Sequence, residues 1–512
     1  MVEQSLKNRF LEAPHVAVDL RTRVVRGVFW VFALKNTARL FRLVRTIILA
    51  RLLAPADFGV FGIALLAIST LYVFTQTGFG RALVQKKQDI KLYLDTAWTV
   101  QIIRAILLAL IIFAIAPYVA AFFDAPAAKP ILQVIAFSVL LGGFGNIGVI
   151  YFQKELEFHK LFVYQLCGTL ADMGVGISVA FLLRSVWALV FGLLAGTVVR
   201  LVLSYFIHPY RPRVRFNSVK AKELYTFGRW VLASCIVVFL ATKGDDIFLG
   251  KVLGVTALGF YQMAFHLSTV MSSEITGTIS KATFPAYAKL QSDIERLSKA
   301  YLRTIRFSTL ITIPVAGGLF ILAPEFTNIL LGEKWTPIIP CLRVLAIMGI
   351  IRSIVGTGGA LILGVGKPKW DFILNLIRVG TIAATIYPLT VLWGILGTAL
   401  STLIGIVATL PIWLYVSINE TSNRTIDYLK ALLPPLAGTL IMCLMIIFFK
   451  SLMSSFQPLG FIGAVLIGIL AYVGVMVGIE KTTGYRFLQE LRTLLISLRG
   501  KEFQQTIQVC ER

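Results

Sequence analysis

Long apolar runs recur along almost the whole sequence, and they constrain the fold more than any other feature. An α-helix needs roughly 20 residues to cross a bilayer. Fourteen apolar runs are long enough, at 24–50, 58–84, 95–122, 130–152, 160–183, 186–208, 225–250, 257–287, 304–324, 337–365, 372–391, 394–416, 430–449 and 459–479. In hydrocarbon every backbone N–H and C=O must find an internal partner, so runs of this length become helices. The sequence therefore predicts an all-α polytopic membrane protein with about 14 transmembrane helices.

The composition supports this class and excludes others. Apolar residues make up 57% of the chain and charged residues only 14%, whereas a soluble domain carries about 25% charged residues. The first 20 residues lack the apolar core of a cleavable signal, so we expect the first span to direct insertion, with nothing removed. The five cysteines form no CxxC pair and the histidines have no ligand spacing, so we expect neither a metal nor another cofactor.

The distribution of positive charge predicts the topology. The formal net charge is +24, but most Lys and Arg lie in short segments between apolar runs, which argues against nucleic acid as a partner. If the N-terminus is cytoplasmic, the tails and cytoplasmic loops hold 29 Lys and Arg, and the external loops hold six. This bias predicts a multi-pass protein of the cytoplasmic (inner) membrane with both termini in the cytoplasm.

An internal repeat at an offset of 200 residues divides the chain. RLLAPADFGVFGIA, from Arg51, aligns with KVLGVTALGFYQMA, from Lys251, and Gly59 falls on Gly259. Repeated halves with a site between them are the architecture of alternating-access transporters. The pattern predicts a cytoplasmic N-terminal tail (1–22), a first six-helix lobe (23–208), a basic cytoplasmic linker (209–223), a second six-helix lobe (224–417), two extra helices (429–480) and an amphipathic cytoplasmic tail (481–512).

The first span carries cations where a membrane helix least tolerates them. Lys35, Arg39, Arg42 and Arg45 occupy its middle third. At about 100° per residue, all four lie on one side of the helix. A cation at the centre of a lipid-facing helix costs roughly 2.5–3.5 kcal/mol, so such residues face a bundle interior or a wet cavity. We interpret this helix as one wall of a central cationic cavity between the two lobes.

Further charges lie at comparable depth, and the balance is positive. Fourteen Lys and Arg fall within or at the ends of the spans, against four acids. Some of these cations snorkel to an interface or pair with the acids, so about half are expected to line the cavity. A cationic cavity suits a polyanion, and phosphate is the anion that best matches the arginine fork. The candidate substrate-binding residues are Lys35, Arg39, Arg42, Arg45, Arg104, Lys243, Arg306 and Arg352, and the acids are Asp172, Asp245, Asp246 and Glu274.

Two interpretations of the acid pair remain open at this point. Asp245 and Asp246 fall at the repeat positions of Arg45 and Thr46. Charge compensation, with Lys243 or an arginine of the first helix as partner, is favoured because neighbouring cations keep carboxylates ionised. The alternative is an ion- or proton-coupling site.

An enzymatic function has little support in the sequence. The external loops are too short for the water-exposed site that an enzyme acting on lipid-linked glycans needs, and we find no Walker A, GxSxG or HExxH motif. The glycine-rich stretches GGFGNIG (142–148) and GTGGALILGVG (356–366) are explained by close helix packing, with a hinge as the alternative.

Several motifs, in order, resemble the polysaccharide transporter family. They are RLLAPADFGVFGIA (51–64), TGFGRALVQKK (77–87), LGFYQMAFHL (258–267), LGEKWTPIIPCLRVL (331–345) and ILGVGKPKWDF (362–372), and the resemblance covers roughly residues 24–420. This family includes lipopolysaccharide and O-antigen flippases and shares a superfamily with multidrug extruders and lipid II flippases. The resemblance implies two lobes that rock around a cavity and move undecaprenyl-diphosphate-linked oligosaccharide to the outer leaflet.

The resemblance also defines partners and alternatives. It implies that the protein has membrane lipids as partners, together with glycosyltransferases and a polysaccharide polymerase of the same pathway. Drug extruders are expected to line their cavity with acids, so the cationic interior disfavours drug export. A lipid II flippase is also expected to be cationic and stays an alternative, separated by the motifs above. From another class, a membrane enzyme modifying lipid-linked glycans would be favoured only if purified protein altered the glycan covalently.

Overall fold

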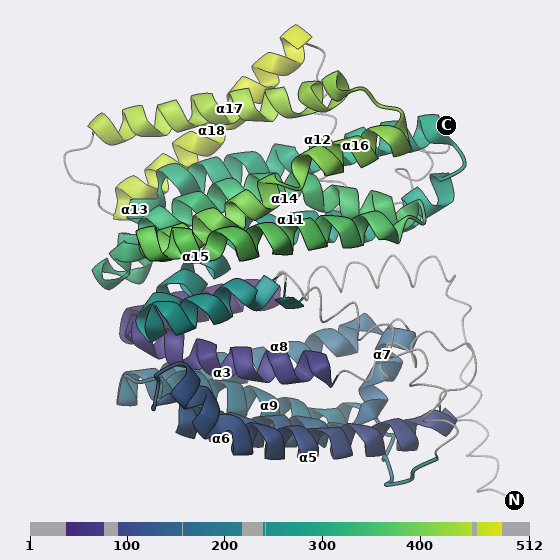
Figure 1. Cartoon of the computed structure of the whole chain (residues 1–512), viewed down its shortest axis with the longest axis vertical. Coiled ribbons are helices and arrows are strands. Elements are labelled where there is room, and N and C mark those ends of the chain that lie inside the picture. Colours follow the sequence, from purple (N-terminus) through teal and green to yellow (C-terminus); the bar gives the residue numbers. More distant parts are fainter. Residues whose placement is uncertain are drawn as a thin grey trace, which may run out of the picture.

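The computed structural model describes residues 37–75, 91–155, 157–217, 239–240, 242–452 and 458–483. Within these ranges every regular element is helical (Figure 1). Nine helices of the described part are long and apolar enough to cross a membrane, or ten if one bent pair is counted as a span. The predicted fold class is therefore confirmed, whereas the count of fourteen spans is not.

The first half of the chain forms one group of packed helices. In this group α8 packs on α9, α5 on α6, and α6 on α9. Residues 37–52 are helical but belong to a predicted span whose start lies outside the described residues. The remaining elements are α3 (Pro55–Phe74), α5 (Lys91–Phe122), α6 (Ala128–Gly143), the 3₁₀ turn η1 (Ile147–Val149), α7 (Ile150–Lys154), α8 (Phe158–Leu183) and α9 (Trp187–Ile207).

The second half forms a second group, followed by a helical pair. Here α11 packs on α12 and α14, and α14 on α15. After the helical residues 242–252 come α11 (Gly254–Leu290), α12 (Ile294–Ile321), α13 (Ala323–Phe326), η2 (Thr327–Leu331), η3 (Glu333–Ile338), α14 (Ile339–Gly364), α15 (Pro368–Val407), α16 (Leu410–Thr421), α17 (Thr425–Leu452) and α18 (Pro458–Thr483). Helices α17 and α18 pack on each other and on α12, at the outer side of the second group (Figure 1).

Helix α15 contains the predicted span 372–391 and the first part of the predicted span 394–416. Its backbone leaves the helical conformation at Gly394, where φ is 58°. The arms on either side then run back along each other, because Thr390 and Thr398 share a hydrogen bond of 2.8 Å. Glycine is needed at this turn because a side chain is strained at positive φ. The sequence placed the boundary between 391 and 394, and the turn lies there.

Two predicted spans are interrupted. The run 130–152 divides into α6 and α7, which are bent by 69°. Within the break, the Asn146 side chain accepts a hydrogen bond of 2.8 Å from the Gly148 amide and so caps the next turn. The run 394–416 is likewise divided, between α15 and α16, near Ala408. A continuous apolar run does not reveal such breaks, because the local capping bonds interrupt the helix without changing hydropathy.

The contact between α3 and α11 joins the two halves and displays the repeat. A Cβ added to Gly59 would lie 1.9 Å from the carbonyl oxygen of Val255, and one added to Gly259 would lie 2.1 Å from that of Pro55. Residues 55 and 255 are equivalent in the repeat, as are 59 and 259. Two-fold pseudo-symmetry produces such reciprocal contacts, so its axis passes between these helices. The absence of side chains at both glycines lets the backbones approach closely.

Candidate functional site

The cation-bearing helix at residues 37–52 presents its arginines in different environments. Arg39 and Arg45 are half-buried, whereas the Arg42 side chain is exposed. Arg42 is close enough to interact electrostatically with Asp172 of α8 and with His266 of α11. Because α8 belongs to the first half and α11 to the second, Arg42 lies between the halves. Lys35 lies outside the described residues, so its place in this wall stays a prediction.

Arg45 is held by an ion pair within the first half. Its Nη2 lies 2.8 Å from Oδ1 of Asp172, and the two side chains are only 14% and 20% exposed. Gly192 leaves room for the guanidinium, since a Cβ there would lie 3.1 Å from Arg45 Nη2 and 2.7 Å from Asp172 Oδ1. Small residues on α8 and α9 therefore let a cation enter the packed pair of helices. The predicted role of Asp172 in charge compensation has a specific partner in Arg45.

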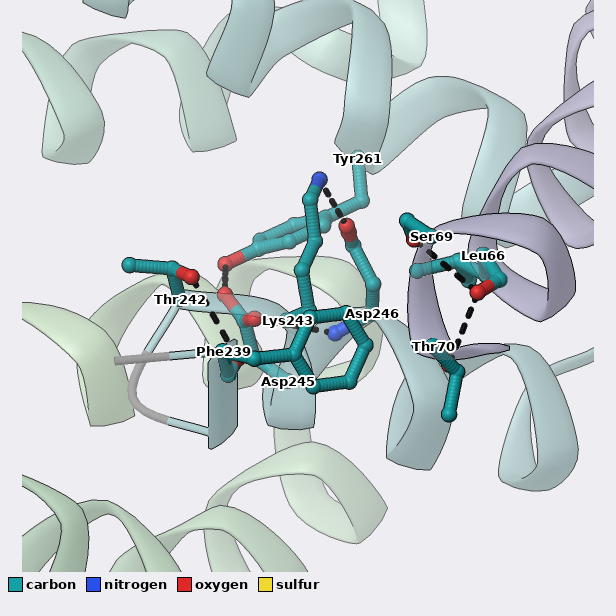
Figure 2. A network of polar contacts seen from close by, with 9 residues as sticks. All are labelled: Leu66, Ser69, Thr70, Phe239, Thr242, Lys243, Asp245, Asp246 and Tyr261. Carbon is teal, nitrogen blue, oxygen red and sulfur yellow. Dashed lines mark hydrogen bonds and ion pairs between the residues drawn. The ribbon is translucent and has the colours of Figure 1, made fainter. Parts of the chain in front are cut away.

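Asp245 and Asp246 form a buried network with neighbouring side chains (Figure 2). Asp245 Oδ2 accepts a hydrogen bond of 2.6 Å from the hydroxyl of Tyr261, which is fully buried. Asp246 Oδ2 lies 2.8 Å from Lys243 Nζ, and its amide donates to Asp245 Oδ1 at 3.0 Å. The carboxylates are 7% and 4% exposed.

The network also has a second cation nearby. Arg378 of α15 interacts electrostatically with Asp245 and Tyr261. Two carboxylates thus face two cations, Lys243 and Arg378, and their formal charges balance. This arrangement supports charge compensation for the acid pair. Lys243, one of the partners considered for the pair from sequence, binds Asp246, whereas the short hydrogen bond of Asp245 comes from Tyr261.

His266, Tyr261 and Arg378 were not among the predicted site residues. His266 lies close enough to both Arg42 and Lys243 for electrostatic interaction. It therefore lies between cations carried by equivalent helices of the two halves. A single histidine in an apolar span has no spacing signal, and only the crossing of the helices reveals its neighbours.

The other predicted residues are spread through the molecule. Arg104 donates to the carbonyl of Tyr72 at 3.1 Å and lies over its ring, so in this structure it binds the end of α3. Arg306 and Arg352 are half-buried on α12 and α14. The Glu274 side chain lies outside the described residues. Among the described residues no cluster of His, Cys, Asp and Glu suits a metal ion.

A polar latch, formed by Arg51, Lys334 and Trp335, joins the halves at one end of the molecule. Lys334 Nζ donates to the carbonyls of Arg51 and Leu53 at 2.9 and 2.6 Å, and Trp335 Nε1 donates to that of Ala50 at 2.9 Å. Arg51 Nε in turn donates to Leu330 at 2.9 Å. Each half thus satisfies carbonyls at a helix end of the other half, where intrahelical partners are missing.

Aromatic packing and further ion pairs strengthen this end. The fully buried Trp335 ring lies between Phe58 of α3 and Phe260 of α11, with centroid distances of 5.3 and 5.8 Å. Lys251, the repeat equivalent of Arg51, pairs with Asp124 of the first half at 2.9 Å. Two further contacts lie at connections predicted to be external. The Glu325–Lys450 ion pair links α13 to α17, and a hydrogen bond of 3.1 Å links the Val186 amide to Asp57 within the first half. The structure therefore closes the molecule between its halves at the latch.

Two repeated helical halves, latched at one end and holding cations between them, define a two-lobe polytopic transporter. The chain belongs to the polysaccharide biosynthesis protein family, whose model matches residues 48–340. It is 25% identical over 363 residues to the lipopolysaccharide biosynthesis protein WzxC of Escherichia coli, covering 70% of this chain and 74% of WzxC. It is 26% identical over 366 residues to the succinoglycan biosynthesis transport protein ExoT of Rhizobium meliloti, covering 71% and 74%.

Solved structures share the fold. The lipid II flippase MurJ, in an inward closed conformation, matches with a TM-score of 0.71 at 15% identity, over 88% of this chain and 98% of MurJ. An inward-facing multidrug resistance transporter of the MATE family, within the MOP superfamily, matches with a TM-score of 0.61 at 17% identity, over 75% and 95%. The chain therefore shares its fold with both of these transporters.

Proposed function

We propose that this protein moves an undecaprenyl-diphosphate-linked oligosaccharide from the cytoplasmic to the outer leaflet of the cell membrane by alternating access. The substrate would be a repeat unit of O-antigen, capsule or exopolysaccharide. The family membership and the names of WzxC and ExoT support polysaccharide biosynthesis as the pathway. Transport without covalent change of the glycan fits the short external connections predicted from the sequence.

One observation carries the choice of an anionic substrate. Arg42 is exposed between the halves, whereas the buried acids have cationic partners of their own in Arg45 and Lys243. The first helix therefore contributes positive charge that these acids do not neutralise. Arginine forks bind phosphate oxygens well, so Lys35, Arg39 and Arg42 would hold the diphosphate. The sugars would fill the wet interior while the prenyl chain stays in lipid.

The latch suggests which half of the transport cycle the structure represents. Bonds between the halves close the end at Trp335, so access would come from the opposite end, which the charge bias assigns to the cytoplasm. Breaking the latch would let the lobes rock and release the substrate outward. Glycosyltransferases would supply this substrate, and a polymerase would consume it after transfer.

Deleting the gene tests the function directly. We expect a lipid-linked glycan repeat to accumulate on the cytoplasmic side, and its mass identifies the substrate. Accumulation of lipid II instead would establish the alternative flippase function. An unchanged pool of both lipids would contradict transport of either one.

Cysteine labelling tests the orientation. A cysteine at Asn217 or Asp371 should react with an impermeant reagent only after permeabilisation, and one at Glu333 should react in intact cells. The reversed pattern would exclude outward delivery.

A further inference from the structure

The segment after α9 is fixed against the first half by its backbone. We name residues Pro209–Asn217 the arginine strap. The amide of Arg213 donates to Asp95 Oδ1 at 3.0 Å, and that of Arg215 donates to Thr99 Oγ1 at 3.0 Å. Tyr210 is held from both sides, because its hydroxyl donates to Asp95 at 2.5 Å and its carbonyl accepts from Asn146 Nδ2 at 2.6 Å. The strap is therefore a positioned element rather than a free connection.

The strap has two chemically different faces. The amides of Arg213 and Arg215 both bond to α5, so this part of the strap repeats every two residues, as an extended backbone does. Arg213 and Arg215 therefore share one side, and Val214 and Phe216 share the other. All three arginines are exposed, and so are Val214 at 74% and Phe216 at 60%. The sequence alternates cations with apolar residues at the period of a strand, whereas membrane-surface helices do so at the period of a helix.

The surroundings leave the strap positively charged. Asp95 accepts two of its hydrogen bonds, and Glu157 is paired with Lys160 at 2.8 Å. Arg211 folds back to donate to the carbonyl of His208 at 2.7 Å. The exposed side chains of Arg213 and Arg215 therefore lie on a surface where Asp95 and Glu157 are already engaged.

The position of the strap places it at the membrane surface. It follows directly after α9, a helix apolar enough to span, whose residue Phe206 is 80% exposed. Phospholipid phosphates lie at that depth, and basic residues beside a spanning helix bind anionic headgroups. A segment that alternates arginines with exposed apolar side chains suits the boundary between acyl chains and headgroups.

We infer that the arginine strap binds anionic phospholipid headgroups of the adjacent leaflet, with Val214 and Phe216 entering the acyl boundary. This binding anchors the first half to the bilayer surface while the second half moves against it. The inference goes beyond the proposed function, because it concerns a resident lipid and not the transported one.

Lipid titration of the purified full-length protein tests the inference. Native mass spectrometry would follow the binding of phosphatidylglycerol, with phosphatidylcholine of the same acyl chains as the neutral reference. The variant Arg213→Gln, Arg215→Gln should weaken phosphatidylglycerol binding, by up to about five-fold for each arginine removed. The variant Arg213→Lys, Arg215→Lys should retain most of it, since the interaction depends mainly on charge.

A matched control removes the same charge elsewhere. The variant Lys129→Gln, Arg184→Gln neutralises two exposed cations of the first half, away from the strap, and should bind phosphatidylglycerol like the unmodified protein. Equal loss in both Gln variants would overturn the inference, as would unchanged binding in the strap variant. Retained lipid binding, together with loss of a co-purifying protein in the strap variant, would assign the strap to a polypeptide partner instead. Loss of glycan export without a change in lipid binding would also overturn the inference, because the strap would then act in transport and not as a lipid anchor.

Discussion

The two halves are alike where they meet but arrange their interior charges differently. At the contact of α3 and α11, Gly59 and Gly259 make reciprocal approaches to equivalent carbonyls. In the interior, Arg45 of the first half pairs with an acid of α8, whereas Asp245 and Asp246 occupy the equivalent region of the second half. The contact between the halves therefore keeps the repeated residues, whereas the charged residues of the two interiors differ. Among the described residues of the first half, Arg42 stays exposed beside the Arg45–Asp172 pair.

The largest effect on stability is expected at the Arg45–Asp172 pair. Asp172→Ala leaves Arg45 buried without its acid, and breaking a buried pair costs about 3–5 kcal/mol. The double variant Arg45→Ala, Asp172→Ala should regain much of that loss because no lone charge remains. Thermal unfolding in detergent measures both variants. If the double variant is as unstable as the sum of the singles, the pair is not a compensating unit.

The latch should depend on Trp335 much more than on Lys251. Truncating a fully buried tryptophan costs about 3–5 kcal/mol, so Trp335→Ala should open this end as well as destabilise the protein. Lys251→Ala should cost less than about 1 kcal/mol, because its pair with Asp124 is exposed at 43% and 78%. Labelling of a cysteine at Phe58 reports opening. Equal labelling in the two variants would contradict the assigned latch.

Glycine substitutions test the pseudo-symmetry. Gly59→Ala and Gly259→Ala should destabilise the protein similarly, by about 1–3 kcal/mol, because each Cβ would meet a backbone carbonyl at about the same separation. Gly174→Ala is the control, since nothing lies within 4 Å of its added Cβ. The measurement is again thermal unfolding. A large effect at one glycine and none at its equivalent would show that the contact is not reciprocal.

The smallest effect is a loosening of the arginine strap in acid. Burial, with Lys160 and Arg211 nearby, lowers the pKa of His208, although Glu157 acts in the opposite direction. The neutral ring accepts a hydrogen bond from the Tyr210 amide at 3.1 Å. His208 takes up a proton more readily in the unfolded state, so its hydrogen bond contributes to the stability of the strap above about pH 6.5. This contribution to stability is lost as the pH falls through the lowered pKa of His208.

Hydrogen exchange of residues 209–217 at pH 7.5 and 5.5 measures that loss. Protection should fall in acid, and His208→Asn should remove most of the pH dependence. Identical protection at the two pH values in the unmodified protein would exclude His208 as the titrating group.

Hydropathy was sufficient to predict the fold class and the boundary near Gly394, and the repeat aligned Gly59 with Gly259, whereas the contact of these glycines was found only in the structure. The length of an apolar run, together with the need to pair every backbone N–H and C=O in hydrocarbon, determines where spanning helices form. The bonds of Trp335 could not be predicted, since the carbonyl of Ala50 carries no sequence signal. The partners of Asp245 and the position of His266 depend on how helices cross, which hydropathy does not encode.

The central claim is that the first helix binds the diphosphate while the acid pair only balances charge. Flipping of the lipid-linked glycan in liposomes, with membrane potential and pH gradient set independently, tests both parts. The variant Arg39→Glu, Arg42→Glu should abolish flipping although the protein inserts normally, because an anion would meet like charge in a poorly screened interior. Asp245→Asn, Asp246→Asn should lower stability, because Lys243 and Arg378 lose their acids. The folded fraction should still flip the glycan and keep any response to potential, worth about 2.3 kcal/mol per elementary charge at 100 mV. Normal flipping by the glutamate variant, or dependence on the pH gradient alone that disappears in the asparagine variant, would contradict the account.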